Sequence, residues 1–430
     1  MKNSEGIYLG RGVHGDATSG HQRSTLVLGP SRSGKTTCVI IPNLLMAASS
    51  CIVTSTKDDV VKTMSRVHRD GATLLFDPSG TVPTPPHVER VGYSPLRQSM
   101  EWDGAVLAAR SLIDVMRRGG VDQPDDHWTE RAGALLAPLL HASARRNRSL
   151  SDVATQIDER SFANTLETLS EEHGEDHPSL SLLRGLEATQ ERELSSIWST
   201  ASGLFSGMRT DAARAAALQP SLSPEEFLAG NHQLHIVSPS RHQAVATPLI
   251  VGLIEQLVHA TYAHHATGAQ LLLALDELAN VAPLPRLASI VSEGGGQGVL
   301  TLACLQDLSQ ARSRWGVNAD GFLSLFPSTL VLSGIADRAT LEMLQHLGGT
   351  NLQSRATVQR GRRGRVTGTS HSYAEQKSLS MAEIAQGRKG YALGLNATKV
   401  IQWVKLSPSY EDQRFAALIA RSRPEGDQPY

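Results

Sequence analysis

The sequence predicts an α/β fold in which a doubly wound, mostly parallel sheet carries an inserted all-helical domain. Short apolar runs alternate with helical patterns in both end regions of the chain, which is typical of a parallel sheet covered by helices. Between residues 101 and 226 the strand-like runs stop, and amphipathic helical periodicity replaces them. We therefore expect a sheet domain made of residues 1–100 and 227–430 and an inserted helical domain made of residues 101–226.

The expected strands follow the chain in order, after a polar, Gly-rich segment of residues 1–24 that we interpret as a hairpin or lid. Apolar runs predict strands at Thr25–Leu28, Ser50–Thr54, Ala72–Phe76, Gln233–Val237, Leu271–Leu275, Val299–Leu305, Leu330–Leu332 and Tyr391–Leu395. We expect the last two to complete a parallel core, and Val400–Leu406 to form an edge strand.

Helical periodicity is clearest in the segment that begins near Trp128, where apolar residues up to Leu140 recur on one face. Further helices are expected at Lys57–His68, Asp152–Ser170, Leu180–Ser202, Thr210–Leu218 and Val245–Ala263. We interpret the aromatic residues of the helical domain, Trp128, Trp198 and Phe205, as core anchors rather than platforms for stacked bases.

Composition limits the class of protein. A length of 430 residues allows two domains, and 41 Lys and Arg against 42 Asp and Glu exclude a strongly basic chain, so any binding of nucleic acid must be local. Cys38, Cys51 and Cys304 lack metal-site spacing and indicate core residues in a reducing compartment. No apolar stretch reaches the roughly 18 residues of a membrane span, so we expect a soluble, cytosolic chain.

The stretch Gly29–Thr36 fits the P-loop pattern G-x-x-x-x-G-K-[ST] without a mismatch. Gly29 and Gly34 let backbone N–H groups surround phosphate oxygens, Lys35 supplies a charge for the terminal phosphates, and the Thr36 hydroxyl is a ligand for Mg²⁺. The expected cofactors are ATP and Mg²⁺. The predicted nucleotide-binding residues are Gly29, Ser31, Arg32, Ser33, Gly34, Lys35, Thr36 and Thr37.

Two further strands are predicted to end at the same crevice. Leu271–Leu275 is followed by Asp276 and Glu277, the Walker B arrangement, in which Asp276 holds Mg²⁺ and Glu277 polarises the attacking water. Gln306 follows the strand at Val299–Leu305, where an amide can sense the terminal phosphate. Glu277, Lys35 and Gln306 are our candidate catalytic residues. Asp77, which also ends a strand, either orients Mg²⁺ or water or caps the next turn.

The segment from Arg355 to Arg365 contains five arginines and no acidic residue, and we interpret it as a flexible loop. It is either a phosphate-contacting element that faces a central channel or a solvated surface loop. The candidate DNA-contacting residues are Arg360, Arg362, Arg363 and Arg365.

Together these motifs resemble the type IV secretion coupling proteins, the TraG/TraD-like conjugative DNA-transfer ATPases related to the FtsK/HerA motors. The resemblance rests on GPSRSGKTTCVIIPNLL at 29–45, LLFDPSG at 74–80, HWTERAGALLAPLL from 127, the long block at 271–316 and LSMAEIAQGRKGYALGLN at 379–396. Its most specific part is D-E-L-A-N from Asp276, followed by Pro285, a Gly-rich turn and a strand that reaches Gln306.

The resemblance implies a RecA-like motor domain in a homohexameric ring with nucleotide sites between subunits. Such a ring pulls single-stranded DNA, usually with a covalently attached relaxase, or a secreted protein towards the type IV secretion channel. The inserted domain would face the cytoplasm and help to recognise cargo. The implied location is cytoplasmic, peripheral at the inner face of the bacterial cell membrane.

Two departures from the family pattern qualify this interpretation. Members usually begin with transmembrane helices, and this sequence shows none, so we expect a soluble fragment or recruitment by a separate membrane anchor. Relatives also carry an arginine in the Gly-rich turn that completes the neighbouring site, whereas here the turn is Gly294–Gly298. Arg286 is our candidate for this trans arginine, with Arg312 and Arg314 as substitutes.

Two alternatives therefore remain open beside the DNA-translocating motor. The first is a coupling ATPase for protein effectors that does not bind DNA. The second is a nucleotide-gated recruitment adaptor with little turnover, which the missing arginine favours.

Overall fold

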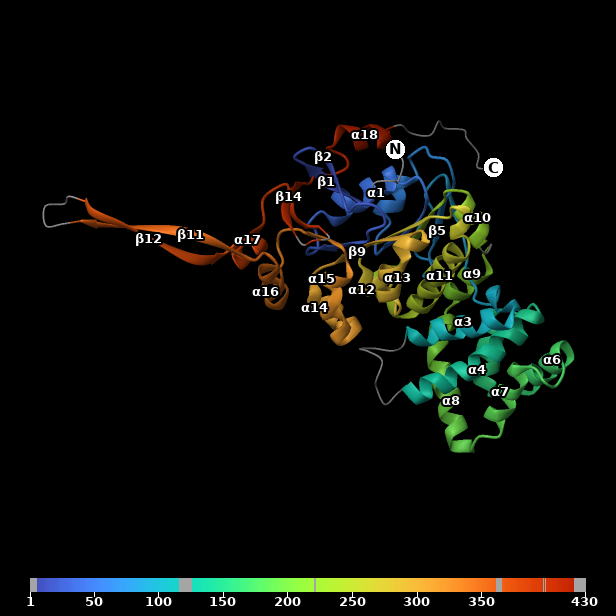
Figure 1. Cartoon of the computed structure of the whole chain (residues 1–430). Helices are drawn as coiled ribbons and strands as arrows, with labels where there is room; N and C mark the ends of the chain where they lie inside the picture. Colours follow the sequence, from blue (N-terminus) through green and yellow to red (C-terminus); the bar gives the residue numbers. More distant parts are fainter. Residues whose placement is uncertain are drawn as a thin grey trace.

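The computed structural model describes residues 6–115, 126–219, 222–360, 366–396, 398 and 400–420. Their main feature is a 12-stranded sheet with the order β2-β1-β14-β13-β10-β3-β9-β8-β4-β7-β5-β6 (Figure 1). In chain order its strands are β1 (Tyr8–Gly12), β2 (Gly15–Thr18), β3 (Thr25–Leu28), β4 (Ser50–Ser55), β5 (Thr73–Phe76), β6 (Val88–Arg90), β7 (Gln233–Val237), β8 (Leu271–Leu275), β9 (Val299–Leu305), β10 (Ser328–Val331), β13 (Tyr391–Leu395) and β14 (Ile401–Lys405).

The strands from β10 to β6 in this order are all parallel to their neighbours. Both faces of this part of the sheet are buried, because alternate side chains of one strand enter different cores. Leu26 and Leu28 of β3 pack on one face, whereas Val27 packs on the other. This arrangement confirms the prediction of a doubly wound, mostly parallel sheet and explains why its strands are uninterrupted apolar runs.

The remaining strands correct two expectations. β13 runs antiparallel to β10 and to β14, so it does not extend the parallel core. β14 is not an edge strand, because β1 pairs with its other side, with Arg11 opposite Lys405, and β2 forms the edge. The link from Leu395 to Ile401 is too short for the crossover that a parallel pair needs, and it permits only a hairpin.

The helices between β6 and β7 are α3 (Trp102–Asp114), α4 (Asp126–Arg145), α5 (Leu150–Glu159), α6 (Ala163–His173), α7 (Pro178–Glu187), α8 (Glu191–Leu204), α9 (Asp211–Leu218) and α10 (Pro224–Ala229). Most of them, from α3 to α8, lie below the sheet in Figure 1, whereas α10 lies beside β5 and its Phe227 O accepts a hydrogen bond from the Ser50 hydroxyl of β4. Trp198 and Phe205 are buried in the core of these helices and Trp128 packs against it, in agreement with the interpretation of these residues as anchors.

Two predicted long helices of this region are each two shorter helices. The expected helix at Asp152–Ser170 is interrupted at Arg160, which takes a left-handed conformation (φ 54°) and ends α5. The expected helix at Leu180–Ser202 is interrupted near Gln190, whose extended backbone (ψ 138°) begins α8. These breaks are set by backbone conformations that residues other than glycine adopt at helix ends, so no Gly or Pro marks them in the sequence.

The other helices cover the sheet. They are α1 (Ile41–Met46), α2 (Asp59–Met64), α11 (Gln243–Ala263), α12 (Leu278–Val281), α13 (Leu287–Glu293), α14 (Leu308–Trp315), α15 (Phe322–Leu325), α16 (Arg338–Leu347), α17 (Met381–Gln386) and α18 (Gln413–Ala420). α2 ends at Met64 rather than at His68, because the chain tightens there into a turn in which the N–H of Val67 donates to Met64 O. Among the helices that the structure describes, none combines the length and apolar character that a membrane crossing requires.

The arginine-rich segment corrects a third expectation. Residues 355–360 are not a loop but lie in β11 (Thr350–Arg360), which pairs antiparallel with β12 (Val366–Lys377). This two-stranded ribbon projects away from the sheet (orange in Figure 1). Thr357 and Val358 are β-branched residues that favour a strand, a signal that the arginine count obscured. Arg362, Arg363 and Arg365 lie outside the described residues.

Candidate nucleotide site

The P-loop joins β3, in the middle of the sheet, to a helix through a turn with unusual backbone angles. Gly34 has a φ of +96°, and Arg32 also has a positive φ, of 65°. At Gly29 a Cβ atom would lie 2.7 Å from Ser33 Oγ, so this position accepts only glycine without displacement. The chain then enters a π-helical turn, Thr36–Ile40, which continues into α1. The sequence thus forms the open loop that surrounds a phosphate, at the carboxyl end of β3.

Lys35 is buried, and its ammonium group is held by the loop itself. Nζ donates hydrogen bonds to the carbonyl oxygens of Gly29 (2.5 Å) and Pro30 (3.0 Å). These carbonyls keep the charge at the centre of the loop. A phosphate in the loop would compete with them for the ammonium group, because a charged acceptor forms the stronger hydrogen bond.

Asp276 lies opposite Thr36, at the carboxyl end of β8. The Thr36 hydroxyl donates to Asp276 Oδ2 over 2.7 Å, and the Thr54 hydroxyl donates to Asp276 O over 2.9 Å. Burial raises the pKa of Asp276 to about 6, an effect that the hydrogen bond from Thr36 partly offsets and the neighbouring Glu277 carboxylate reinforces. The two residues that the sequence assigns to a metal are therefore in direct contact.

Glu277 follows in a strained conformation. Its φ is 56° and its ψ is 45°, in the left-handed region that non-glycine residues avoid. Asn280 Nδ2 donates to its Oε2 over 3.2 Å. Glu277 and Asp276 line the same cavity.

The P-loop and these acidic residues enclose a cleft of about 410 Å³. Its lining comes from the P-loop and the residue after it, from the two residues that follow β8, and from the stretch that runs from the last residue of β4 to the first residue of α2. The residues are Ser31, Arg32, Ser33, Gly34, Lys35, Thr36, Thr37, Ser55, Thr56, Lys57, Asp59, Asp276 and Glu277. Our sequence reasoning did not assign Ser55, Thr56, Lys57 or Asp59 to the site. The sequence signal for them was the polar run directly after the β4 strand. Because neighbouring parallel strands end at one edge of a sheet, residues that follow β4 can lie at the same cleft as residues that follow β8.

Gln306 lies one strand away from the P-loop strand. It follows β9, whose last carbonyl, on Leu305, accepts from the N–H of Gly29 over 3.1 Å. The N–H of Gln306 donates to Gln310 Oε1 over 2.9 Å. Its half-buried side chain is not among the described residues that line the cleft.

The three arginines considered for the trans role lie away from this cleft in their own subunit. Arg286 is exposed and lines a different cavity of about 280 Å³, beside α3, α11 and α13. Arg312 pairs with Asp337 over 2.8 Å. Arg314 donates to Val115 O over 3.3 Å. An arginine that acts on a neighbouring subunit is expected to lie away from its own cleft, and of these three Arg286 is exposed whereas Arg312 and Arg314 are partly buried.

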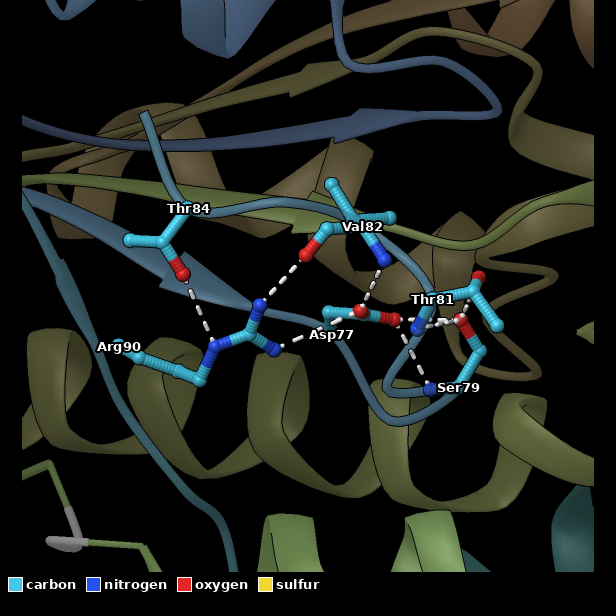
Figure 2. A network of polar contacts seen from close by, with 6 residues as sticks. All are labelled: Asp77, Ser79, Thr81, Val82, Thr84 and Arg90. Carbon is cyan, nitrogen blue, oxygen red and sulfur yellow. Dashed lines mark hydrogen bonds and ion pairs between the residues drawn. The ribbon is translucent and has the colours of Figure 1, made fainter. Parts of the chain in front are cut away.

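Asp77 has a structural position. Its buried carboxylate accepts hydrogen bonds from the N–H (2.9 Å) and hydroxyl (2.5 Å) of Ser79 and from the N–H of Val82 (2.8 Å), and it forms an ion pair with Arg90 at 3.5 Å (Figure 2). Arg90 in turn donates to Val82 O and to Thr84 Oγ1. Of the two alternatives for Asp77, the structure supports the turn cap, since this network uses both carboxylate oxygens.

Comparison with known proteins identifies the family. The family model described as Type IV secretory system Conjugative DNA transfer matches residues 1–384. No curated protein sequence matches the chain. Among solved structures, the unbound monoclinic form of the bacterial conjugative coupling protein TrwBdeltaN70 has a TM-score of 0.68 at 19% identity and covers 90% of this chain and 85% of its own.

Two complexes of the plasmid coupling protein TrwB are similar at the same 19% identity. The complex with the ATP analogue ADPNP has a TM-score of 0.67, with 94% of this chain and 90% of that chain covered. The complex with ADP and Mg²⁺ has a TM-score of 0.65, with 90% and 85% covered. These matches establish the fold as a RecA-like P-loop domain with an all-helical domain. Because the family model extends over most of its length, this chain belongs to the type IV secretory system conjugative DNA transfer family.

Proposed function

We propose that this chain is an ATP-hydrolysing coupling protein that recruits and translocates single-stranded DNA, with its relaxase, to a type IV secretion channel. Its motor domain would be formed by residues 1–100 and 227–430, with residues 101–226 as the inserted domain. The observation that carries this proposal is the contact between Thr36 and Asp276 in a cleft built on a P-loop. Membership of a conjugative DNA transfer family supplies the substrate class.

The residues of the cleft suit a nucleotide with Mg²⁺. The Thr36 hydroxyl and the Asp276 carboxylate are hard oxygen donors in contact with each other, which is the donor type that Mg²⁺ prefers. These two residues would hold the metal, and the similar TrwB was crystallised with ADP and Mg²⁺. When bound, Mg²⁺ would neutralise charge on the phosphate oxygens.

The protein groups would divide the remaining tasks. The backbone N–H groups of the loop from Gly29 to Thr37 would bind phosphate oxygens, and Lys35 would leave its carbonyl partners for the terminal phosphates. Glu277 would accept a proton from the attacking water, and Gln306 would sense the terminal phosphate. Arg286 of a neighbouring subunit is our proposed trans residue in a homohexameric ring.

DNA would be contacted in the centre of such a ring. We propose that Arg360, at the end of β11, and Arg362, Arg363 and Arg365, which follow in the sequence, contact phosphates. The net charge of the chain, −1, gives one subunit little attraction for DNA, so affinity should depend on assembly. We propose that a separate membrane anchor recruits the chain to the inner face of the bacterial cell membrane.

The test is steady-state ATP hydrolysis at low salt, with and without single-stranded DNA, for wild type, Lys35→Ala and Glu277→Gln. DNA-stimulated turnover that both variants lose supports the motor. An ATP hydrolysis rate that is the same with and without DNA, together with no DNA affinity, would indicate a coupling ATPase for protein effectors. Nucleotide binding without turnover under any condition would indicate a recruitment adaptor.

A further inference from the structure

The nucleotide cleft contains a second lysine, Lys57, which the P-loop does not supply. It follows β4, the strand that pairs with β8 on the side away from the P-loop strand, with Thr54 opposite Leu275. The Thr54 hydroxyl also donates to Asp276 O over 2.9 Å. The segments after β4 and β8 therefore leave the sheet side by side. Lys57 lines the cleft, and in the strand order β4, which it follows, and β3, which leads to Lys35, lie on opposite sides of β8.

The local structure keeps Lys57 at the cleft. Its N–H donates to Ser55 Oγ over 3.1 Å, which fixes the turn between β4 and α2. The adjacent Asp58 carboxylate pairs with Lys62 over 2.7 Å, so the acid nearest in sequence is engaged by another lysine. The side chain of Lys57 is exposed and lies on the wall of the cavity. Its ammonium group is therefore available to an anion in the cleft.

The negative charges in the cleft favour a cation in addition to those of the P-loop. The described lining includes three acidic side chains, Asp59, Asp276 and Glu277, and a nucleoside triphosphate adds several negative charges. The Gly-rich turn, which lacks an arginine, precedes β9 at Val299, whereas the cleft lies where β3 and β8 end. Arg312 and Arg314 have partners elsewhere. The described lining also contains two cations of the P-loop, Arg32 and Lys35, so Lys57 is the lining cation that comes from outside the P-loop.

We propose that Lys57 is a further catalytic residue, whose ammonium group contacts the terminal phosphate of a bound nucleoside triphosphate and stabilises its charge during hydrolysis. This inference rests on the proposed function. In the reaction, water attacks the γ-phosphorus while the bond to the β–γ bridging oxygen breaks, and ADP leaves with that electron pair. Glu277 takes the proton of the water. Lys57 transfers no proton and compensates charge on the γ-phosphoryl oxygens.

The test compares triphosphate and diphosphate binding in Lys57→Ala. A charge-assisted hydrogen bond to the γ-phosphate predicts that Lys57→Ala weakens ADPNP binding by about tenfold to a hundredfold. ADP affinity should stay within about twofold of wild type, because ADP lacks that phosphate. Turnover at saturating ATP should fall at least as much as ADPNP affinity, and Lys57→Arg should restore most of both. Lys62→Ala is the matched control, since Lys62 lies on α2 and pairs with Asp58.

The outcomes separate this inference from the proposed function. Equal losses of ADP and ADPNP affinity in Lys57→Ala, or no loss of either, would overturn the role of Lys57 even if wild type hydrolyses ATP. If wild type binds nucleotides without turnover, the motor proposal fails. A selective loss of ADPNP affinity in Lys57→Ala would then still establish the contact with the γ-phosphate.

Discussion

The hydroxyl of Thr36 donates a hydrogen bond to Oδ2 of Asp276, although 240 positions separate the two residues in the sequence. One residue begins the helix after β3 and the other follows β8, and β9 lies between these strands in the sheet. The parallel order of the strands brings their carboxyl ends to one edge, and the contact follows from that order. The strand order of the sheet thus brings the two oxygen donors, the Thr36 hydroxyl and the Asp276 carboxylate, together.

Removing this hydroxyl should weaken Mg²⁺ binding in particular. We expect Thr36→Val to lower the affinity for Mg²⁺ in the presence of ADP by about tenfold or more, because a metal ligand is lost and the Asp276 carboxylate loses the partner that orients it. Thr36→Ser, which keeps the hydroxyl, should lie close to wild type. Isothermal titration of Mg²⁺ into the ADP-bound protein measures both. Equal Mg²⁺ affinities of Thr36→Val and Thr36→Ser would exclude the hydroxyl from the metal site.

Asp276 should make the free energy of unfolding decrease as pH rises, which is the opposite of the usual effect of a carboxyl group. Burial raises its pKa to about 6, above the ordinary 3.8, so between these values the folded protein binds more protons than the unfolded chain. The contribution of Asp276 to the free energy of unfolding is therefore largest below pH 3.8 and decreases as pH rises towards 6. We expect Asp276→Asn to gain stability relative to wild type between pH 4.5 and pH 7.

Urea unfolding of both proteins at these two pH values measures this effect, provided that each protein is folded at both. The informative quantity is the difference between wild type and Asp276→Asn, because other titrating groups cancel in it. A difference that does not change with pH would mean that the carboxyl group titrates near its ordinary pKa.

Replacement of Glu277 should abolish ATP turnover, and the stability of the variant should depend on whether the new residue has a Cβ atom. The φ of 56° at this position strains any residue with a Cβ atom, so we expect Glu277→Gly to be more stable than Glu277→Ala by about 1 kcal/mol. Both variants lose the carboxylate, and both should lose ATP turnover while they retain nucleotide binding. Thermal or urea unfolding of the two variants measures the difference. If Glu277→Ala proved as stable as Glu277→Gly, the backbone strain would be absent in solution.

Asp77 should affect folding and not chemistry. Its buried carboxylate satisfies two N–H groups, a hydroxyl and the Arg90 guanidinium, so we expect Asp77→Ala to lower the free energy of unfolding by about 2–4 kcal/mol. The ATP turnover of the protein that remains folded should equal that of wild type. Turnover lost in well-folded Asp77→Ala, with stability unchanged, would instead support the role in orienting Mg²⁺ or water.

The parts of the molecule that the sequence predicted well depend on short-range patterns. The P-loop needs only a strand, a glycine pattern and a helix, and the strand before Asp276 is a purely apolar run. The sheet follows because each of its central strands is buried on both faces. Some of the wrong parts depend on distant partners, since the position of β14 is set by β1, almost 400 residues earlier, whereas the break between α5 and α6 follows from the left-handed conformation of Arg160.

The cleft shows the same limit. Lys57 and Asp59 line the cleft because β4 pairs with β8. No local sequence motif indicates that these two strands are neighbours in the sheet. The role of Asp77 was open because a carboxylate at a strand end suits a metal or a turn equally, and only its partners Ser79, Val82 and Arg90 distinguish the two. Sequence patterns therefore predict which strands exist, whereas pairing between them decides which side chains share a site.

DNA affinity should depend on the arginines at the end of β11 and directly after it. We expect replacement of Arg360, Arg362, Arg363 and Arg365 by alanine to weaken binding of single-stranded DNA. The slope of log affinity against log salt concentration should become shallower by about 0.7 for each arginine that contacts a phosphate. Replacement of the same four residues by lysine keeps the charge and should largely preserve both the affinity and the slope.

Fluorescence anisotropy with a labelled oligonucleotide, from low to moderate salt, measures both quantities. An unchanged slope in the alanine variant would mean that the phosphate contacts lie elsewhere, and the proposal of a basic channel built on this segment would be wrong even if ATP hydrolysis were stimulated by DNA.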